Sequence, residues 1–257
     1  MNRIDRLFAS NKKNLLSVYF TAGFPQLDDT VGIIRALDAA GVDMVEIGMP
    51  FSDPMADGPV IQHSSQVALQ NGISQQRLFD QLKDIRRYTD MPLVLMGYIN
   101  PVLQFGFENL CQKAVEVGID GFIIPDIPLD VYRKEFAPIV EKYGLCFTLL
   151  VTPETSDERV REIDAASSGF VYLVSSASTT GAQKDFDAQK QAYFKRIEAM
   201  KLRNPLMVGF GVSNKETFEA AAAHTRGCIV GSAFVKLLEE STSIDEAVKI
   251  LVQRIRG

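Results

Sequence analysis

Glu46 is suited to proton exchange if the short apolar run around it forms a strand. Successive side chains of a strand point to opposite faces, so Met44, Glu46 and Gly48 share one face, and Val45 and Ile47 share the other. We expect the apolar pair to contact helices, which directs Glu46 into the interior of the protein. Burial there raises the pKa of a carboxyl group and prepares it for proton exchange near neutral pH. The alternative is a structural glutamate that pairs with a lysine or arginine.

A proline-rich loop, expected to run from Gly48 to about Ser64 before the next helix begins, follows this strand and carries two more acids. It contains Asp53 and Asp57 among Pro50, Pro54 and Pro59. Proline restricts φ, so the loop can hold an acidic side chain in place at a small entropy cost. We therefore expect Asp57 to act with the strand glutamate, whereas Asp53 fits equally well as a turn residue before a proline. A magnesium site built from the three acids is the rival interpretation, but no histidine or further acid cluster completes it, so no metal is expected.

Two glycine-containing segments near the carboxyl end of the chain are suited to binding phosphate. They run from Gly209 to Gly211 and from Gly231 to Ala233, each directly after an apolar run. Glycine lets backbone N–H groups approach an anion closely, and a helix that starts near Ser232 would direct its positive end at the same point. Either segment alone is ordinary turn chemistry. The pair together predicts a phosphate site.

A small, polar segment from Ser175 to about Asp187 has the composition of a lid that orders over a ligand. An idle surface loop is the alternative interpretation. The two histidines, His63 and His224, stand near expected helix ends with no nucleophile pattern beside them, so we interpret both as structural. No Ser-His-Asp or Cys-His arrangement supports covalent catalysis.

Eight short apolar runs provide the elements that must position these residues. Runs of this length and composition are typical of buried parallel strands. The expected strands are Leu16–Phe20, Met44–Ile47, Pro92–Met96, Gly121–Ile124, Cys146–Leu150, Phe170–Val174, Pro205–Val208 and Gly227–Val230.

Helical segments alternate with these runs and carry start and stop signals. Capping-box patterns, which satisfy the free N–H groups of a first helical turn, are expected at three places. They are Thr155 with Glu158, Ser213 with Glu216, and Ser243 with Glu246. Glycines that end a helix in the left-handed conformation are expected at Gly41, Gly118, Gly144 and Gly169.

Eight strand-and-helix units in 257 residues favour a single (β/α)8 barrel, or TIM barrel, with extra short helices. Periodicity alone does not exclude an open doubly wound sheet. No linker or shift in composition divides the chain, so one domain over residues 1–257 is expected. In such barrels the loops after the strands build the active site.

The bulk composition narrows the class of protein further. The chain is 46% hydrophobic and 23% charged, with a net charge of −5, which is typical of a soluble globular protein and disfavours nucleic-acid binding. Cys111, Cys146 and Cys228 are far apart and odd in number, so neither disulfides nor a zinc site is expected, and a reducing cytoplasm fits. The apolar run Leu15–Phe20 is too short for a signal segment, and no membrane association is expected.

The segment from Val45 to Gln62 resembles the signature of the tryptophan synthase alpha chain family. Its sequence is VEIGMPFSDPMADGPVIQ, a long and specific match. Shorter matches to the same family occur along the rest of the chain, at TAGFP from Thr21, MGYINP from Met96, IPDIP from Ile124, TGA from Thr180, GFG from Gly209 and GSA from Gly231.

This resemblance implies a lyase that splits indole-3-glycerol phosphate into indole and glyceraldehyde 3-phosphate. Glu46 would be the proton shuttle, and Asp57 would hold the indole N–H and stabilise charge on that ring. Tyr98, Tyr172 and Phe210 would line the indole end, together with Tyr19 at a position that is aromatic in other members and Thr180 in the lid. The implied phosphate contacts are Gly181, Gly211, Gly231 and Ser232. Ser176 and Ser178 depart from the family pattern, in which arginine and glycine are common at these positions, so a lost charge and an extra side chain are expected to alter lid closure and its communication with the partner.

The family resemblance also implies a beta-chain partner, usually in an α2β2 heterotetramer. That partner would carry pyridoxal phosphate and receive indole directly for tryptophan synthesis, while this chain holds no cofactor. Two other functions stay open: a free-standing lyase that releases indole, and a barrel that has lost catalysis and only activates a partner. The presence of both Glu46 and Asp57 disfavours the last of these.

Overall fold

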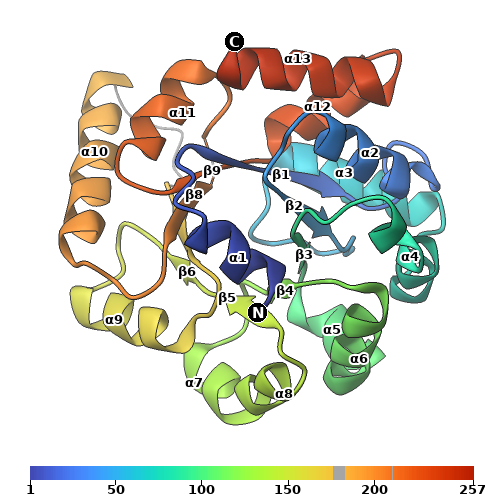
Figure 1. Ribbon diagram of the computed structural model, residues 1–257, viewed down its shortest axis with the longest axis horizontal. Helices are drawn as coiled ribbons and strands as arrows, with labels where there is room; N and C mark the ends of the chain where they lie inside the picture. Colours follow the sequence, from blue (N-terminus) through green and yellow to red (C-terminus); the bar gives the residue numbers. More distant parts are fainter. Residues whose placement is uncertain (176–182, 210) are drawn as a thin grey trace.

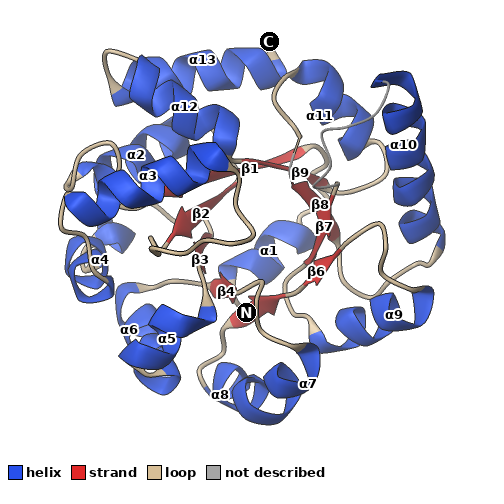
Figure 2. Cartoon of the chain, turned by 180° about the vertical axis from the view of Figure 1, so that it is seen from behind, coloured by secondary structure: helices blue, strands red, loops and turns tan. Residues whose placement is uncertain are grey.

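The computed structural model describes residues 1–175, 183–209 and 211–257, and its strands form one parallel sheet that curls into a barrel (Figures 1 and 2). The sheet order is β5-β4-β3-β2-β1-β9-β8-β7-β6, and every pairing is parallel. The strands are β1 (Leu15–Thr21), β2 (Met44–Gly48), β3 (Leu93–Met96), β4 (Gly121–Ile123), β5 (Cys146–Thr148), β6 (Leu150–Val151), β7 (Val171–Val174), β8 (Leu206–Gly209) and β9 (Gly227–Val230).

The barrel closes through the stretch that was expected to be one strand, Cys146–Leu150. β5 pairs with β4 and β6 pairs with β7, so the chain changes neighbours at Leu149, and this expected strand is two short strands instead. The Tyr172 N–H donates to the Leu149 carbonyl at 3.1 Å, and the Ser168 N–H donates to the Phe147 carbonyl at 2.9 Å. These bonds join the two ends of the sheet. The expected (β/α)8 barrel is therefore confirmed.

Helices surround the barrel, as Figure 2 shows, and several of them are short. They are α1 (Arg3–Ala9), α2 (Asp29–Ala39), α3 (Pro59–Gln70), α4 (Gln75–Leu82), the 3₁₀ helix η1 (Ile85–Arg87), α5 (Ile99–Phe105), α6 (Phe107–Val117), α7 (Leu129–Val131), the π-helical η2 (Tyr132–Phe136), α8 (Ala137–Lys142), α9 (Asp157–Ala166), α10 (Gln183–Ala199), α11 (Lys215–Ala222), α12 (Ser232–Glu240) and α13 (Ile244–Arg256). None of the helices in the described part of the chain is long and apolar enough to cross a membrane.

Two helices begin earlier than the sequence pattern indicates. α3 starts at Pro59 rather than near Ser64, because the fixed φ of proline suits the first helical position, where no N–H bond is needed. α10 starts at Gln183 rather than after Asp187, so the connection that follows β7 is shorter than expected.

Only one of the three expected helix caps forms at the expected residue. Ser243 caps α13, and its hydroxyl accepts from the Glu246 N–H at 3.2 Å. α9 is capped by Ser156 instead of Thr155, whose hydroxyl accepts from the Thr152 N–H in the preceding turn. The Thr155 hydroxyl is therefore used in the preceding turn and does not cap α9.

α11 also begins one residue later than expected. Asn214 rather than Ser213 is its cap, and the Asn214 carboxamide accepts from the Thr217 N–H at 2.9 Å while the Thr217 hydroxyl closes the capping box. Asparagine caps a helix as well as serine does, so Asn214 takes the place that the pattern assigned to Ser213. The expected stop signals are confirmed by positive φ values of 76°, 86°, 65° and 84° at Gly41, Gly118, Gly144 and Gly169.

The core has an inner part inside the barrel and an outer part between strands and helices. Val45 and Ile47 belong to the outer part, and Met44 belongs to the inner part, as the alternation in this strand predicted. Ile4 and Phe8 of α1 also belong to the inner part and lie at the amino-terminal ends of the strands, where α1 crosses the barrel in Figure 1. That end of the barrel is therefore filled, which leaves the other end for a ligand.

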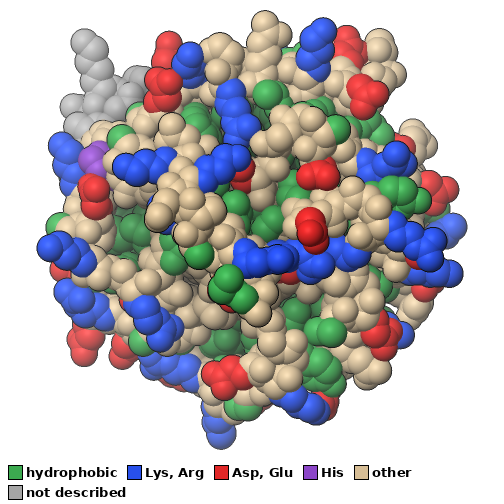
Figure 3. Space-filling view, in the orientation of Figure 1, with side chains coloured by type: hydrophobic (Ala, Val, Ile, Leu, Met, Phe, Trp, Pro, Cys, Tyr) green, Lys and Arg blue, Asp and Glu red, His purple; other side chains and the backbone are tan. Residues whose placement is uncertain are grey.

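Ion pairs strengthen the closed end of the barrel. Asp120, which is buried, binds Arg3 at 3.2 Å and Arg86 at 2.7 Å, and it accepts from the Leu93 N–H at 2.9 Å. On the surface of the same side, basic and acidic side chains are intermixed rather than segregated (Figure 3).

Candidate active site

Glu46 lies in the middle of β2 and is completely buried. One carboxyl oxygen, Oε1, accepts from the Ser17 hydroxyl of β1 at 3.1 Å, while Oε2 has no hydrogen-bond partner among the described residues. Among the described residues, no lysine or arginine pairs with this carboxyl, which argues against a structural ion pair. Burial raises its pKa to about 8, although the bond from Ser17 opposes the shift. Near neutral pH Glu46 is therefore mostly a neutral acid.

Asp57 lies on the loop between β2 and α3, half-buried. The Tyr98 hydroxyl donates to its Oδ2 at 2.9 Å and in turn accepts from the Ala56 N–H at 3.1 Å. Burial raises the pKa of Asp57, and the bond from Tyr98 opposes this shift. Tyr98 directly precedes α5, so two loops from neighbouring strands hold this carboxylate.

Two tyrosines, one on β1 and one on β7, need glycines at the ends of the adjacent strands β2 and β8. A Cβ atom on Gly48 would lie 2.2 Å from the Tyr19 hydroxyl, and one on Gly209 would lie 1.8 Å from the Tyr172 hydroxyl. Only glycine leaves room for either ring. Burial raises the pKa of both tyrosines, so both hydroxyls stay protonated.

A cavity of about 210 Å³ brings most of the expected site residues together. Expected residues in its lining are Tyr19, Glu46, Asp57, Tyr172, Gly211, Gly231 and Ser232. Tyr98 does not line it but supports Asp57 from outside. Thr180, Gly181 and Phe210 lie outside the described residues, as do Ser176, Ser178 and the centre of the expected lid.

The same cavity has lining residues that the sequence analysis did not single out. They are Gly58, Pro59, Val60, Ile61, Met96, Val212 and Ile229. Alternation in β9 directs Ile229 inward and could have identified it. The first turn of α3, from Pro59 to Ile61, was missed because that helix was expected to begin later.

Three of the four expected phosphate residues, Gly211, Gly231 and Ser232, line this cavity. Gly211 has φ +73°, and Gly231 directly precedes α12, whose first residue is Ser232. The amino-terminal end of α12 therefore contributes its partial positive charge near the lining. Among the described lining residues there is no lysine or arginine.

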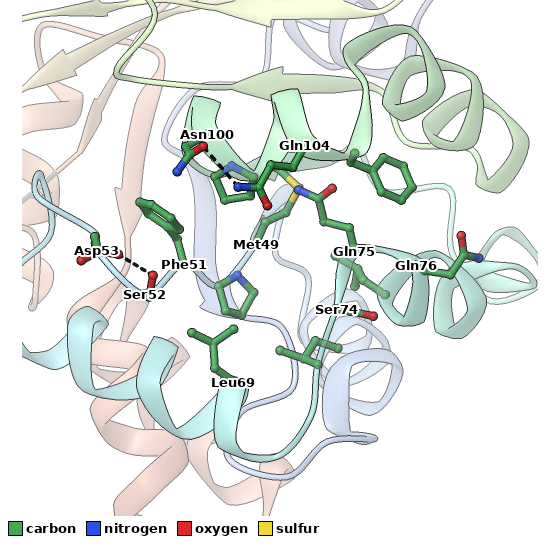
Figure 4. A pocket seen from close by; sticks show the side chains of 15 residues that line it. Met49, Phe51, Ser52, Asp53, Leu69, Ser74, Gln75, Gln76, Asn100 and Gln104 are labelled. Carbon is green, nitrogen blue, oxygen red and sulfur yellow. Dashed lines mark hydrogen bonds between the residues drawn. The ribbon is translucent and has the colours of Figure 1, made fainter.

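Asp53 belongs to a different cavity. A hollow of about 580 Å³ lies between the loop after β2 and helices α3, α4 and α5, and Figure 4 shows Asp53 at its edge, bonded to Ser52. The three acids considered for magnesium are thus divided between two cavities. In the part of the chain that the structure describes, no group of three or more His, Cys, Asp or Glu side chains is placed to hold a metal ion.

Both histidines make contacts on the outside of the barrel and do not line the cavity. His63 Nε2 lies 3.0 Å from Glu239, and His224 contacts Glu198 through Nδ1 at 2.7 Å and Gln191 through Nε2 at 3.1 Å. The first contact joins α3 to α12, and the others join the turn after α11 to α10, in agreement with the structural interpretation.

The fold and the site define a (β/α)8-barrel protein with an acid-lined pocket at the carboxyl-terminal ends of its strands. The sequence model of the tryptophan synthase alpha chain family matches residues 5–255. The chain belongs to this family, as the resemblance predicted.

Individual relatives agree along nearly the whole chain. The tryptophan synthase alpha chain of Bacteroides thetaiotaomicron is 60% identical over 96% of this chain and 97% of its own length, and that of Parabacteroides distasonis is 56% identical over 100% of both. Among solved structures, tryptophan synthase subunit alpha from Legionella pneumophila is 35% identical, covers 100% of this chain and 97% of its own, and has a TM-score of 0.89. The tryptophan synthase complex from Pyrococcus furiosus is 35% identical, covers 95% and 98%, and has a TM-score of 0.84.

Proposed function

We propose that this chain is the alpha subunit of tryptophan synthase and cleaves indole-3-glycerol phosphate to indole and glyceraldehyde 3-phosphate. The observation that carries the proposal is the Glu46 carboxyl, which is fully buried at a cavity shared with Asp57 and keeps one oxygen without a partner in the described residues. The direct test is incubation of the purified chain with indole-3-glycerol phosphate, with indole and the aldehyde measured separately. Equal amounts of both products are expected.

Glu46 can supply both proton transfers of this cleavage. As a neutral acid it gives its proton to indole C3, which places positive charge on the ring nitrogen. As a carboxylate it then takes the proton of the hydroxyl on the adjacent carbon. The carbon–carbon bond breaks, its electron pair returns to the ring, the aldehyde forms, and Glu46 is protonated again.

Asp57 is proposed to accept a hydrogen bond from the indole N–H. Its negative charge then stabilises the positive charge that grows on the ring after C3 is protonated. Tyr98 fixes the carboxylate in place through its 2.9 Å bond. Tyr19, Tyr172 and Phe210 are proposed to surround the indole ring, with Tyr98 supporting Asp57 from outside the cavity, and Thr180 is proposed to contact the ligand or Asp57 from the lid.

The substrate phosphate is proposed to bind backbone N–H groups at Gly181, Gly211, Gly231 and Ser232. Gly211→Val tests this site. The positive φ of Gly211 costs a side chain about 1–2 kcal/mol, and valine would also block the close approach of the anion.

We expect Gly211→Val to raise KM for indole-3-glycerol phosphate and to weaken competition by inorganic phosphate, with a smaller change in the melting temperature. Steady-state kinetics and thermal unfolding measure the two effects. Normal KM in a folded variant would show that the phosphate binds elsewhere.

The pH dependence of kcat/KM tests the two carboxyl groups. Glu46 must begin as the acid, so activity should fall as pH rises through about 8. Asp57 must be ionised, so activity should also fall on the acid side, at a pH above the usual aspartate range because burial raises its pKa. Ser17→Ala removes the bond that lowers the Glu46 pKa and should move the basic limb to higher pH. A basic limb that does not move would contradict this assignment.

A beta chain is proposed as the partner, in an α2β2 heterotetramer in the cytoplasm, with indole passed directly to it. We propose that this chain holds no cofactor and that the pyridoxal phosphate is carried by the beta chain. The relative from Pyrococcus furiosus, solved as a tryptophan synthase complex, supports this partnership. Free-standing release of indole is the alternative function. Slow cleavage by the chain alone that rises strongly with an added beta chain supports the partnered function, and fast cleavage unaffected by it supports the alternative.

A further inference from the structure

A second cavity lies directly behind the expected phosphate loop. It has a volume of about 430 Å³ and opens between α10 and α11. Gly211 and Val212 line both this cavity and the one that contains Glu46 and Asp57. Gly211 and Val212 therefore form a wall between the two cavities.

Lys190 of α10 reaches this wall from the second cavity. Its Nζ atom lies 3.3 Å from the position that a Cβ atom on Gly211 would occupy, and the Ser175 hydroxyl lies 3.5 Å from the same point. Lys190 is half-buried. An ammonium and a hydroxyl thus meet at the backbone of a glycine that is expected to face an anion.

The residues that follow Lys190 hold this part of α10 against the barrel. The Tyr193 hydroxyl donates to the Val151 carbonyl of β6 at 2.9 Å, and Phe194 is only 3% exposed. The Gln191 side chain contacts His224 at 3.1 Å and the Ala220 carbonyl at 3.4 Å. These contacts fix the start of the Lys190 side chain, which lowers the entropy cost of holding its ammonium at Gly211.

The charges of the two cavities make Lys190 the suitable counter-ion. The cavity with Glu46 and Asp57 carries two carboxyl groups and, among the described residues that line it, no lysine or arginine. A phosphate dianion that binds only through N–H groups beside an aspartate would be poorly neutralised. Among the described residues that line the Lys190 cavity, Glu216 is the acidic one. Only Gly211 separates the Lys190 ammonium from the expected position of the phosphate, so a small movement of the side chain would bring the two charges together.

We infer that the Lys190 ammonium binds the phosphate group of the substrate at the Gly211 loop. This inference rests on the proposed function, because it names the cation of that same phosphate site. Glycine at position 211 then has two roles: it lets the anion approach the backbone on one side, and it lets the lysine approach on the other.

Calorimetric titration of the full chain with glycerol 3-phosphate and, separately, with indole tests the inference. Lys190→Met keeps the length of the side chain and removes its charge, and we expect it to weaken binding of glycerol 3-phosphate about tenfold while leaving indole binding unchanged. Lys190→Arg should restore most of the affinity. Lys195→Met removes an exposed lysine from the same helix and should bind both ligands like the wild-type chain.

In turnover of indole-3-glycerol phosphate, Lys190→Met should raise KM by a similar factor with kcat nearly unchanged, since phosphate binding is alike in the ground and transition states. Unchanged affinity for glycerol 3-phosphate, or equal loss of affinity for both ligands, would overturn the inference. If the wild-type chain binds glycerol 3-phosphate but cleaves nothing, the proposed function fails while the titrations still decide the role of Lys190.

Discussion

A Glu46→Gln variant is expected to lose cleavage of indole-3-glycerol phosphate by about a thousandfold or more. Glutamine keeps the size of the side chain and can still accept the bond from Ser17, but it has no proton to give to indole C3 and cannot take one from the hydroxyl. Because one carboxyl serves both transfers, its removal affects both steps. Single-turnover measurement of indole formation, with binding of glycerol 3-phosphate as a second readout, separates chemistry from binding.

The stability of the same variant provides the control for folding. Burial raises the pKa of Glu46 to about 8 in the folded chain, whereas the ordinary value is 4.5. Because the neutral form is favoured in the folded chain, the contribution of Glu46 to the free energy of unfolding is largest below pH 4.5 and is lost as pH rises through about 8. Glutamine cannot ionise, so Glu46→Gln should melt at an equal or higher temperature than the wild type at pH 8, and the difference should shrink toward pH 5.

An inactive variant that melts higher than the wild type would show that Glu46 is kept at a cost in stability for the reaction. Retention of most of the activity would remove Glu46 from the proposed mechanism. A large fall in melting temperature would instead support a structural role, which the missing partner of Oε2 in the described residues argues against.

The placement of Glu46 could be predicted from the sequence because it depends on local geometry alone. Alternation along Met44–Gly48 separates the inner from the outer face, and buried strands repeated at regular intervals predict the barrel. The glycine stops at Gly41 and Gly118 were predictable for the same reason, since a left-handed residue at a helix end favours glycine whatever surrounds it.

Other features depend on contacts between distant residues and had no local signal. The break at Leu149 arises because β5 and β6 pair with different neighbours, β4 and β7. The space that Gly48 leaves for Tyr19 also appears only when two strands are side by side. Motif spacing alone does not indicate such complementarity.

The hydrogen bond between Tyr98 and Asp57 is another contact between distant residues that the sequence did not indicate, and it has a direct functional consequence. The two residues are 41 positions apart and lie on different loops, yet the tyrosine hydroxyl fixes the carboxylate that we propose binds the indole N–H. Sequence analysis placed both in the site but assigned Tyr98 to the indole wall. In the structure the Tyr98 hydroxyl instead donates a hydrogen bond that holds the Asp57 carboxylate in place.

Asp57→Asn is expected to lower kcat by about a hundredfold, with a smaller change in KM. The amide oxygen can still accept from the indole N–H, so the ground state is bound almost as well. It has no negative charge to offset the positive ring nitrogen that forms when C3 is protonated, so the loss appears in the transition state. Steady-state kinetics with the beta chain present and absent measure the effect.

Asp53→Asn is the matched control for this prediction. Asp53 lies on the same loop and has the same charge, but it lines the neighbouring cavity with Ser52 rather than the one with Glu46. Its replacement should leave kcat within about twofold of the wild type, as expected for a residue that does not touch the substrate. Equal losses in the two variants would trace the effect to the loop or to overall charge, and an unchanged kcat in Asp57→Asn would exclude this carboxylate from charge stabilisation.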